Sequence, residues 1–120
     1  MTKGQIESKI SEAISKFEIE QMGRGPEKIR TIIIQDVIFI RLKGFLSPSE
    51  KNLAQNREGV ELIKKVRAAL FENARMSLEG AIKSVIDVNV ISTHSDVSTK
   101  TGEKIIAVVV DKNIEESINE

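Results

Sequence analysis

The sequence predicts an α+β fold, a two-layer sandwich in which helices pack on one face of an antiparallel sheet of about four strands. Stretches with helical and strand periodicity follow each other in the order α-β-β-α-α-β-β, and short polar segments separate the members of each strand pair. No linker or low-complexity stretch divides the 120 residues, and a chain of this length buries about two-thirds of its unfolded surface. We therefore expect one domain over residues 1–112 and a C-terminal tail over residues 113–120.

The first helix is predicted over Lys3–Met22, followed by a β-hairpin. Apolar residues recur at helical spacing and define one buried stripe: Ile6, Ile10, Ile14, Phe17 and Met22. The motif Gly-Arg-Gly-Pro at residues 23–26 ends the helix, because glycine suits a helix C-terminus and proline cannot continue one. Two runs rich in Ile and Val, residues 29–34 and 37–42, are predicted to pair across a turn at Gln35 and Asp36.

A short helix and a long one are predicted next. Ser47, Pro48 and Glu50 have the pattern of a capping box with proline in the first turn, which starts a helix over residues 48–55. Residues 57–84 then carry apolar side chains every three or four positions, which predicts one long helix spanning roughly 40 Å. Four strands are only about 19 Å wide, so one end of this helix is expected to project.

The last hairpin is predicted from residues 85–93 and 104–110, joined by a polar loop over residues 94–102. The first strand is placed by the alternation of Ile86, Val88 and Val90 with polar neighbours. Beyond the second strand, Asn113 caps one helical turn or the tail frays.

Several strands are apolar on both faces, in particular residues 32–34, 37–40 and 105–110. Helices on one side of the sheet would leave the other side bare, which soluble monomers rarely tolerate. Either the short helix or the tail crosses to that face, or a second subunit or another partner covers it. The projecting helix favours the second alternative, and we expect a homo-oligomer, with a dimer favoured.

The composition excludes several kinds of chemistry. There is no Cys and only one His, so thiolate nucleophiles, disulfides and Cys-ligated metals are impossible, and we expect neither a metal site nor a cofactor. Lys and Arg number 18, as do Asp and Glu, and there is no Tyr or Trp. Zero net charge and few aromatic residues argue against nucleic-acid binding. The chain carries no signal-peptide or membrane-span pattern, so we expect a cytoplasmic protein.

Two segments are candidates for function, each with a purely structural alternative. The glycines of the Gly-Arg-Gly-Pro motif would let an anion approach the backbone beside Arg24, or they only cap the helix and turn the chain. The loop from His94 to Gly102 would hold an acid–base or metal site that uses His94 and Asp96. Alternatively, its hydroxyl and carboxylate groups only cap a solvated hairpin turn.

These motifs resemble those of a bacterial family, the C component of the sodium-translocating membrane-potential-generating system, whose members are MpsC-like or YbcI-like domains. The resemblance covers about residues 4–111. It rests on Gly-Arg-Gly-Pro and on Leu-Ser-Pro-Ser-Glu at residues 46–50, followed by Leu53 and Ala54. The stretch from Arg57-Glu58-Gly59 to Val66-Arg67, and Asp96 with the turn Thr101-Gly102-Glu103, extend the match. The chain lacks the aromatic pair that many relatives carry before Gly23 and has Gln21 and Met22 there. The resemblance marks seven motif positions without assigning a role to any of them: Gly23, Arg24, Gly25, Pro26, Pro48, Glu50 and Leu53.

The resemblance implies a cytoplasmic accessory protein, peripheral at the inner face of the membrane, in contact with a complex that moves cations and supports bicarbonate or CO2 supply. Together with the two-faced strands, it leads us to expect a non-enzymatic, dimeric interaction domain. The alternative function is a sensor of small anions such as bicarbonate, which would use Arg24 and the segment from His94 to Gly102.

Overall fold

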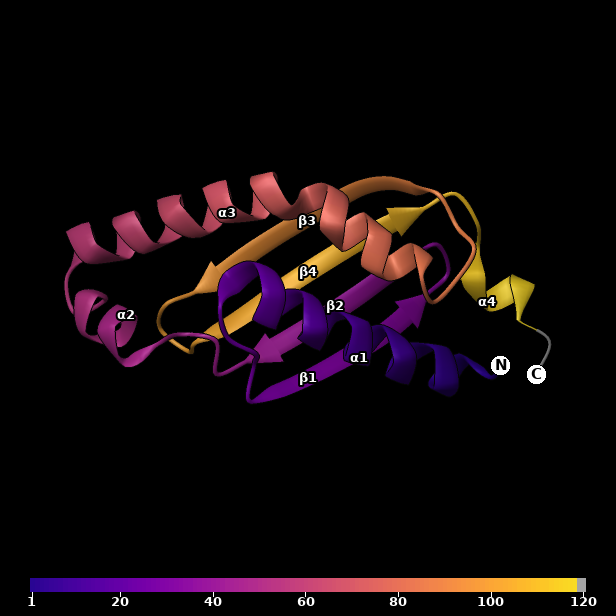
Figure 1. The fold of residues 1–120 in the computed structure, drawn as a ribbon, viewed down its shortest axis with the longest axis horizontal. Coiled ribbons are helices and arrows are strands. Elements are labelled where there is room, and N and C mark those ends of the chain that lie inside the picture. The colour runs from indigo at the N-terminus through magenta and orange to yellow at the C-terminus, as the bar shows by residue number, and fades with distance from the viewer. Residues whose placement is uncertain (119–120) are drawn as a thin grey trace.

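The computed structural model describes residues 1–118 and has the predicted order α-β-β-α-α-β-β, followed by one further helical turn (Figure 1). The elements are α1 (Lys3–Met22), β1 (Lys28–Ile34), β2 (Val37–Lys43), α2 (Pro48–Leu53), α3 (Arg57–Lys83), β3 (Val90–Ser98), β4 (Glu103–Val110) and α4 (Ile114–Ser117). Helices α1 and α3 lie on one side of a single sheet. The predicted α+β class is confirmed.

The four strands form an antiparallel sheet in the order β1-β2-β4-β3. The two hairpins therefore join in the middle of the sheet, where Val37 pairs with Val109 and Lys43 pairs with Glu103. This order places β1 and β3 at opposite edges. The turn of the first hairpin is at Gln35 and Asp36 as predicted, and Gln35 adopts a positive φ of 55° there.

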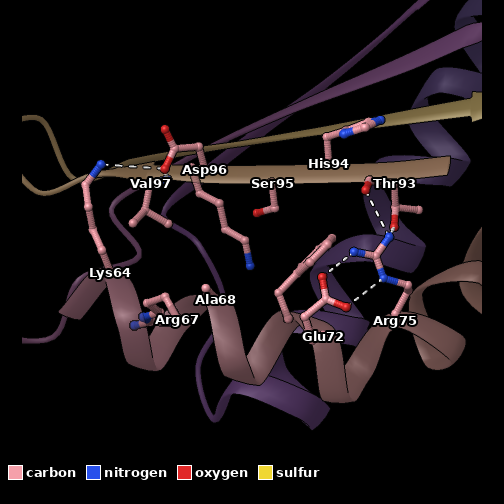
Figure 2. A pocket seen from close by; sticks show the side chains of 12 residues that line it. Lys64, Arg67, Ala68, Glu72, Arg75, Thr93, His94, Ser95, Asp96 and Val97 are labelled. Atoms are coloured by element: carbon pink, nitrogen blue, oxygen red, sulfur yellow. Dashed lines mark hydrogen bonds and ion pairs between the residues drawn. The ribbon is translucent and has the colours of Figure 1, made fainter. Parts of the chain in front are cut away.

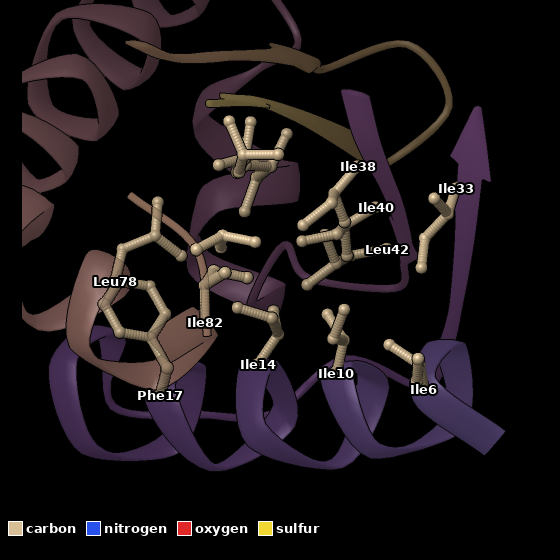
Figure 3. Packing of buried hydrophobic residues seen from close by; sticks show 14 of the residues in the cluster. Ile6, Ile10, Ile14, Phe17, Ile33, Ile38, Ile40, Leu42, Leu78 and Ile82 are labelled. Carbon is tan, nitrogen blue, oxygen red and sulfur yellow. The ribbon is translucent and has the colours of Figure 1, made fainter. Parts of the chain in front are cut away.

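The core lies between the sheet and the two long helices (Figure 3). One stripe of α1 meets every second residue of the strands, since side chains alternate between the two faces of a sheet. The fully buried aliphatic residues come from all of these layers: Ile10, Ile14, Ile33, Ile38, Ile40, Leu42, Leu78, Ile82, Ile106 and Val108. No helix in the described part of the chain combines the length and the apolar character that a membrane span requires.

Helix α3 extends past the sheet at its N-terminal end, as its length predicted (Figure 1). The molecule accordingly measures 49 × 23 × 22 Å. The C-terminal half of α3 packs into the main core through Phe71, Leu78 and Ile82. The N-terminal half reaches only a second, smaller cluster formed by Phe45, Leu46, Ile63 and Val97. We call this N-terminal half, residues 57–70, the arm.

The predicted strand over residues 85–93 is wrong, because β3 begins at Val90 and runs to Ser98. The apolar residues before it serve the helix end instead. The amides of Val85 and Ile86 both donate to the carbonyl of Ile82 at 3.1 Å, and Val88 enters the core from the connection. Ile86 and Val88 alternate with polar residues because they pack against the core from a turn, and not because they form a strand. The predicted loop over residues 94–102 shrinks to a turn over residues 99–102.

The C-terminal segment forms the helical turn that the sequence allowed. Asn113 caps α4, and its side chain accepts a hydrogen bond from the amide of Glu116. Ile114 is fully buried in the main core, and its amide donates to the carbonyl of Gln35 at 2.8 Å. Two smaller boundaries also differ from prediction: α2 ends at Leu53 and α3 ends at Lys83.

Candidate functional site

The Gly-Arg-Gly-Pro motif forms the turn between α1 and the edge strand β1. Gly23 ends α1 in the left-handed conformation, with φ of 86°, which glycine adopts without the usual steric penalty. A Cβ on Gly25 would lie 3.1 Å from the Ile19 side chain. Arg24 is exposed, and its guanidinium has no hydrogen-bond or ion-pair partner among residues 1–118. Both glycines therefore have a structural role, and Arg24 is the one motif side chain free to meet another molecule.

The second motif builds the corner between β2 and α3. Ser47 caps α2: its hydroxyl accepts from the amide of Glu50 at 3.2 Å, and its own amide donates to the Glu50 carboxylate at 3.0 Å. Pro48 occupies the first turn, where a missing amide proton does no harm. The predicted capping box is confirmed.

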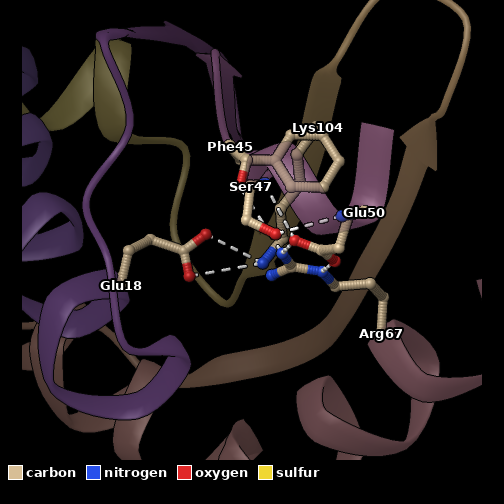
Figure 4. A network of polar contacts seen from close by, with 6 residues as sticks. All are labelled: Glu18, Phe45, Ser47, Glu50, Arg67 and Lys104. Carbon is tan, nitrogen blue, oxygen red and sulfur yellow. Dashed lines mark hydrogen bonds and ion pairs between the residues drawn. The ribbon is translucent and has the colours of Figure 1, made fainter. Parts of the chain in front are cut away.

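Glu50 also ties α2 to α3 (Figure 4). Its carboxylate accepts two hydrogen bonds from Arg67, at 3.0 Å from Nε and 2.7 Å from Nη2, and the guanidinium lies 4.9 Å from the centre of the Phe45 ring. Partial burial by itself raises the pKa of Glu50, but the hydrogen bonds from Arg67 and Ser47 outweigh it, so that the pKa lies below its ordinary value. Glu50 therefore acts as a charged structural link.

Gly59 belongs to the family resemblance, which gives it no role, and the structure shows that it is essential to the same corner. A Cβ at this position would lie 1.7 Å from the carbonyl oxygen of Leu53, the last residue of α2. The amide of Gly59 donates at 2.8 Å to the side chain of Asn56, the cap of α3. The signal in the sequence was a glycine inside the first turn of a predicted helix.

His94 and Asp96 lie on β3 and not in a loop, which corrects their predicted setting. As alternate residues of a strand they point to one side, away from α3 (Figure 2). The His94 ring is 3.2 Å from the Ser92 hydroxyl, and Asp96 forms an ion pair with Lys64 at 3.6 Å. Gly102, with φ of 70°, closes the hairpin turn. Within residues 1–118 no group of three or more His, Asp or Glu side chains is placed to hold a metal ion.

A cleft of about 280 Å³ opens between α3 and β3 (Figure 2). Its cations come mainly from α3, namely Lys64, Arg67 and Arg75. Each is already paired with an acid of the chain: Lys64 with Asp96, Arg67 with Glu50, and Arg75 with Glu72. Arg75 also donates to the carbonyl of Thr93 at 2.9 Å. An anion could enter this cleft only by competing with those carboxylates.

Beneath the cleft lies a buried ion pair that the sequence pattern did not predict (Figure 4). Lys104 of β4 donates to both carboxylate oxygens of Glu18 in α1, at 2.9 and 3.3 Å. The exposed fractions are 3% for Glu18 and 2% for Lys104, and the ammonium lies 5.6 Å from the Phe71 ring. The pair joins the end of α1 to the sheet below α3. Lys104 also lines the floor of the cleft, but the low exposure of both residues indicates a structural link.

The face of the sheet turned away from α1 and α3, which we call the open face, exposes large apolar side chains. The strands alternate between buried and more exposed residues as two-faced strands should. The most exposed apolar members are Ile32 at 38%, Ile34 at 50%, Phe39 at 39% and Ile105 at 38%. Helix α2 packs on α3, and α4 places Ile114 in the core, so neither helix covers this face. The predicted bare face is confirmed.

Four basic residues lie at one end of the open face, on β1 and β2. The register sets Arg30 directly opposite Arg41, and Lys28 directly opposite Lys43. Like charges in directly opposed positions destabilise a sheet. Of the four, only Arg41 has an acidic partner within residues 1–118, namely Glu103 at 2.6 Å. Two successive pairs of this kind indicate a surface shaped for contact with something acidic.

The arm of α3 carries a second unpartnered surface. Leu62, Val66 and Leu70 are spaced four residues apart and are 48%, 55% and 39% exposed. Seven residues beyond Leu70, Ser77 lines the groove between α3 and α1. The three apolar residues therefore continue the flank of α3 on which α1 packs, past the point where α1 ends. We call them the arm stripe.

The sequence is similar to a known protein family and to two proteins of Bacillus subtilis (strain 168). The model of the family described as "Na+-translocating membrane potential-generating system (MpsC)" matches residues 2–112. The uncharacterized protein YbcI of Bacillus subtilis (strain 168) is 34% identical over 117 residues, which is 98% of this chain and 94% of that protein. The uncharacterized protein YrhF of the same strain is 27% identical over 109 residues, covering 89% and 88%. No solved structure matches.

Proposed function

The chain belongs to the MpsC family, and from this membership we propose that it is a non-enzymatic accessory subunit that docks at the cytoplasmic face of a Na+-translocating, membrane-potential-generating complex. The observation that carries the proposal is the arm stripe of Leu62, Val66 and Leu70, an apolar surface on a projecting helix. The charged side chains of the nearby cleft are engaged in pairs within the chain. The only imidazole, His94, lies beside a serine hydroxyl. Contact, and not turnover, is what this arrangement supports.

The partner surface is an amphipathic helix of the membrane complex. A spacing of four residues presents Leu62, Val66 and Leu70 as one ridge, which suits packing against a second helix. The same flank of α3 already accepts α1 in its C-terminal half, so a partner helix would occupy the place that α1 leaves free. Full burial of one such side chain contributes about 1.5–3 kcal/mol. Each of the three is about half exposed, so the stripe retains a large part of that gain for binding.

Val66→Glu is expected to reduce co-purification with the detergent-solubilised complex at least tenfold, because it places a charge in the centre of the stripe. The measurement uses a tagged chain, membranes of cells that contain the complex, and quantification of the retained subunits. Val66 is 55% exposed, so the substitution should leave the thermal unfolding temperature unchanged. Met76→Glu is the matched control, since Met76 is an 85% exposed apolar residue on the same helix outside the stripe.

Co-purification of the Val66→Glu variant at the level of the unaltered chain would refute docking through the stripe. Equal losses for Val66→Glu and Met76→Glu would do the same, because they would reflect added charge alone. Failure of the unaltered chain to retain any subunit of the complex would refute the proposed function itself.

A second candidate function, a sensor of small anions such as bicarbonate, has one supporting observation: three cations of α3, Lys64, Arg67 and Arg75, line the cleft between α3 and β3. Arg24 would take no part, because it precedes β1 while His94 lies on β3 at the opposite edge of the sheet. An anion at 100 times its dissociation constant stabilises a protein by about 2.7 kcal/mol. This candidate predicts a bicarbonate-dependent rise in Tm that Arg75→Gln abolishes. No rise with bicarbonate, phosphate or chloride would eliminate it.

A further inference from the structure

We propose that a second copy of this chain covers the open face, with the two sheets packed face to face about a twofold axis parallel to the strands. The axis passes between the two central strands, β2 and β4. This contact uses a different surface from the arm stripe, so it is independent of the proposed docking function. Three features of the open face support it: where its charges lie, how its side-chain sizes match, and how large it is.

The register divides the open face into four rows that run across the strands. In the order β1, β2, β4 and β3, the first row is Ile34, Val37, Val109 and Ser92, and the second row is Ile32, Phe39, Ala107 and His94. The third row is Arg30, Arg41, Ile105 and Asp96, and the fourth row is Lys28, Lys43, Glu103 and Ser98. The first two rows are apolar across β1, β2 and β4. The last two are basic on β1 and β2, and their two acids lie on the other half of the sheet.

A twofold axis along the strands places each row on the same row of the second copy in reverse order. Strand β1 then faces β3 of the second copy, and β2 faces its β4. Arg30 meets Asp96 of the second copy, and Lys43 meets Glu103. An axis across the strands would instead set the apolar first row on the charged fourth row, which would bury charges against aliphatic side chains. Charge placement therefore selects the axis parallel to the strands.

Side-chain size agrees with the same axis. Phe39, the largest apolar side chain on the face, lies opposite Ala107 of the second copy, and Val37 lies opposite Val109. A large side chain facing a small one lets two layers interdigitate at the density of a protein interior. Two sheets packed in this way keep their strands within about 30° of each other, so the four rows stay in register over the centre of the contact.

The contact also relieves the like-charge pairs within each copy. Arg30 and Arg41 repel each other across the hairpin, and neither Arg30 nor Lys43 has an acidic partner in residues 1–118. Asp96 can accept a further cation, because 83% of its side chain is exposed even though Lys64 approaches at 3.6 Å. The second copy thus brings Asp96 to Arg30. It also brings Glu103, which accepts from Arg41 of its own copy as well, to Lys43.

The size of the face indicates a dimer of low affinity. Four strands are about 19 Å wide and seven residues are about 23 Å long. The flat area of the face is therefore roughly 440 Å² per copy, without the additional surface of the projecting side chains. For both copies together this is about 880 Å², which is below the roughly 1,200 Å² at which stable interfaces begin and within the range of weak, transient contacts. We therefore expect a dissociation constant in the micromolar range, and dimerisation that weakens at high salt because its register depends on ion pairs.

The test is sedimentation equilibrium from low to high micromolar protein at low ionic strength. The unaltered chain is expected to dimerise. Arg30→Asp and Asp96→Arg should each weaken the dimer at least tenfold, because each places like charges in contact. The double variant should restore the dissociation constant to within about threefold, since it only exchanges the two partners. Arg57→Asp is the charge-matched control, because the Arg57 side chain is 94% exposed on α3 and lies away from the open face.

Several outcomes would overturn the proposal. A monomer at 100 times the lowest concentration tested would exclude the dimer. A dimer that Arg30→Asp leaves unchanged, or that the double variant does not restore, would place the second copy on another surface or about another axis. If the chain is monomeric but binds vesicles of anionic lipid, and Phe39→Glu abolishes that binding, the occupant of the open face is a membrane and the dimer is wrong. Val66→Glu should leave the dimer intact, which separates this test from that of the arm stripe.

Discussion

Lys104→Met is expected to lower the free energy of unfolding by about 3–5 kcal/mol, the range found when one member of a buried ion pair is removed. The substitution would leave the Glu18 carboxylate without its ammonium partner in a place where its residue is only 3% exposed. The double variant Glu18→Leu/Lys104→Met should recover most of the loss. Replacement of a complete buried pair by apolar side chains of similar volume is often neutral or stabilising.

Urea denaturation followed by far-ultraviolet circular dichroism measures this effect, because the chain has no Trp or Tyr for a fluorescence signal. The control pair is Arg57 and Glu61, whose side chains are 94% and 70% exposed and 3.4 Å apart. Arg57→Met should change the free energy of unfolding by less than about 1 kcal/mol. If the double variant is no more stable than Lys104→Met, the loss of stability does not come from leaving the Glu18 carboxylate without a partner.

The buried pair also shows where sequence periodicity stops being informative. Glu18 comes one turn after Ile14 on the apolar stripe of α1, and Lys104 occupies the buried phase of a strand that continues with Ile106. A charged residue in the buried phase of its helix or strand is a sign in the sequence that it has a partner inside the protein. Periodicity nevertheless assigns a charged residue to solvent, because burial of a lone charge is unfavourable. Only the arrangement of α1 over β4, which local sequence does not encode, brings the two charges together.

The wrong prediction of a strand over residues 85–93 has a related cause. Ile86 and Val88 alternate with Asp87 and Asn89, and periodicity alone predicts a strand from such alternation. Ile86 and Val88 are apolar because the turn after α3 is pressed against the core.

The true strand, β3, is mostly polar on both sides. Thr93 and Ser95 border the cleft, and Ser92, His94 and Asp96 lie at the edge of the open face. The helices and the first hairpin were predictable because burial there follows one regular period.

The candidate surfaces were predictable to different extents. Apolar residues on both faces of the strands are enough to indicate a bare sheet face, and the exposed side chains of Ile34 and Phe39 define where it lies. The opposition of Arg30 to Arg41 depends on register, as does the placement of Asp96 at the far edge. The arm stripe depends on where α1 ends relative to α3, which no local pattern specifies. Motif residues such as Gly23 were identifiable from the sequence, and the structure gives them capping roles.

Gly59→Ala is expected to lower the free energy of unfolding by about 2–4 kcal/mol, through overpacking at a site that cannot relax. The new Cβ would lie 1.7 Å from the carbonyl oxygen and 2.7 Å from the carbonyl carbon of Leu53, and both atoms belong to the backbone. A flexible side chain could rotate away, but here α2 itself would have to move. That movement is opposed by the two hydrogen bonds from Arg67 to Glu50, which hold α2 against α3.

Gly80→Ala is the matched control because it makes the same substitution in the same helix with the opposite expected sign. Nothing lies within 4 Å of a Cβ at Gly80, so alanine should stabilise the protein by about 0.5–1 kcal/mol through its higher helix propensity. The two variants together separate helix propensity from the contact with Leu53. If Gly59→Ala were as stable as Gly80→Ala, the close approach of α2 to α3 would not exist in solution. The arm would then be held by the small cluster around Ile63 and by the ion pairs of Lys64 and Arg67.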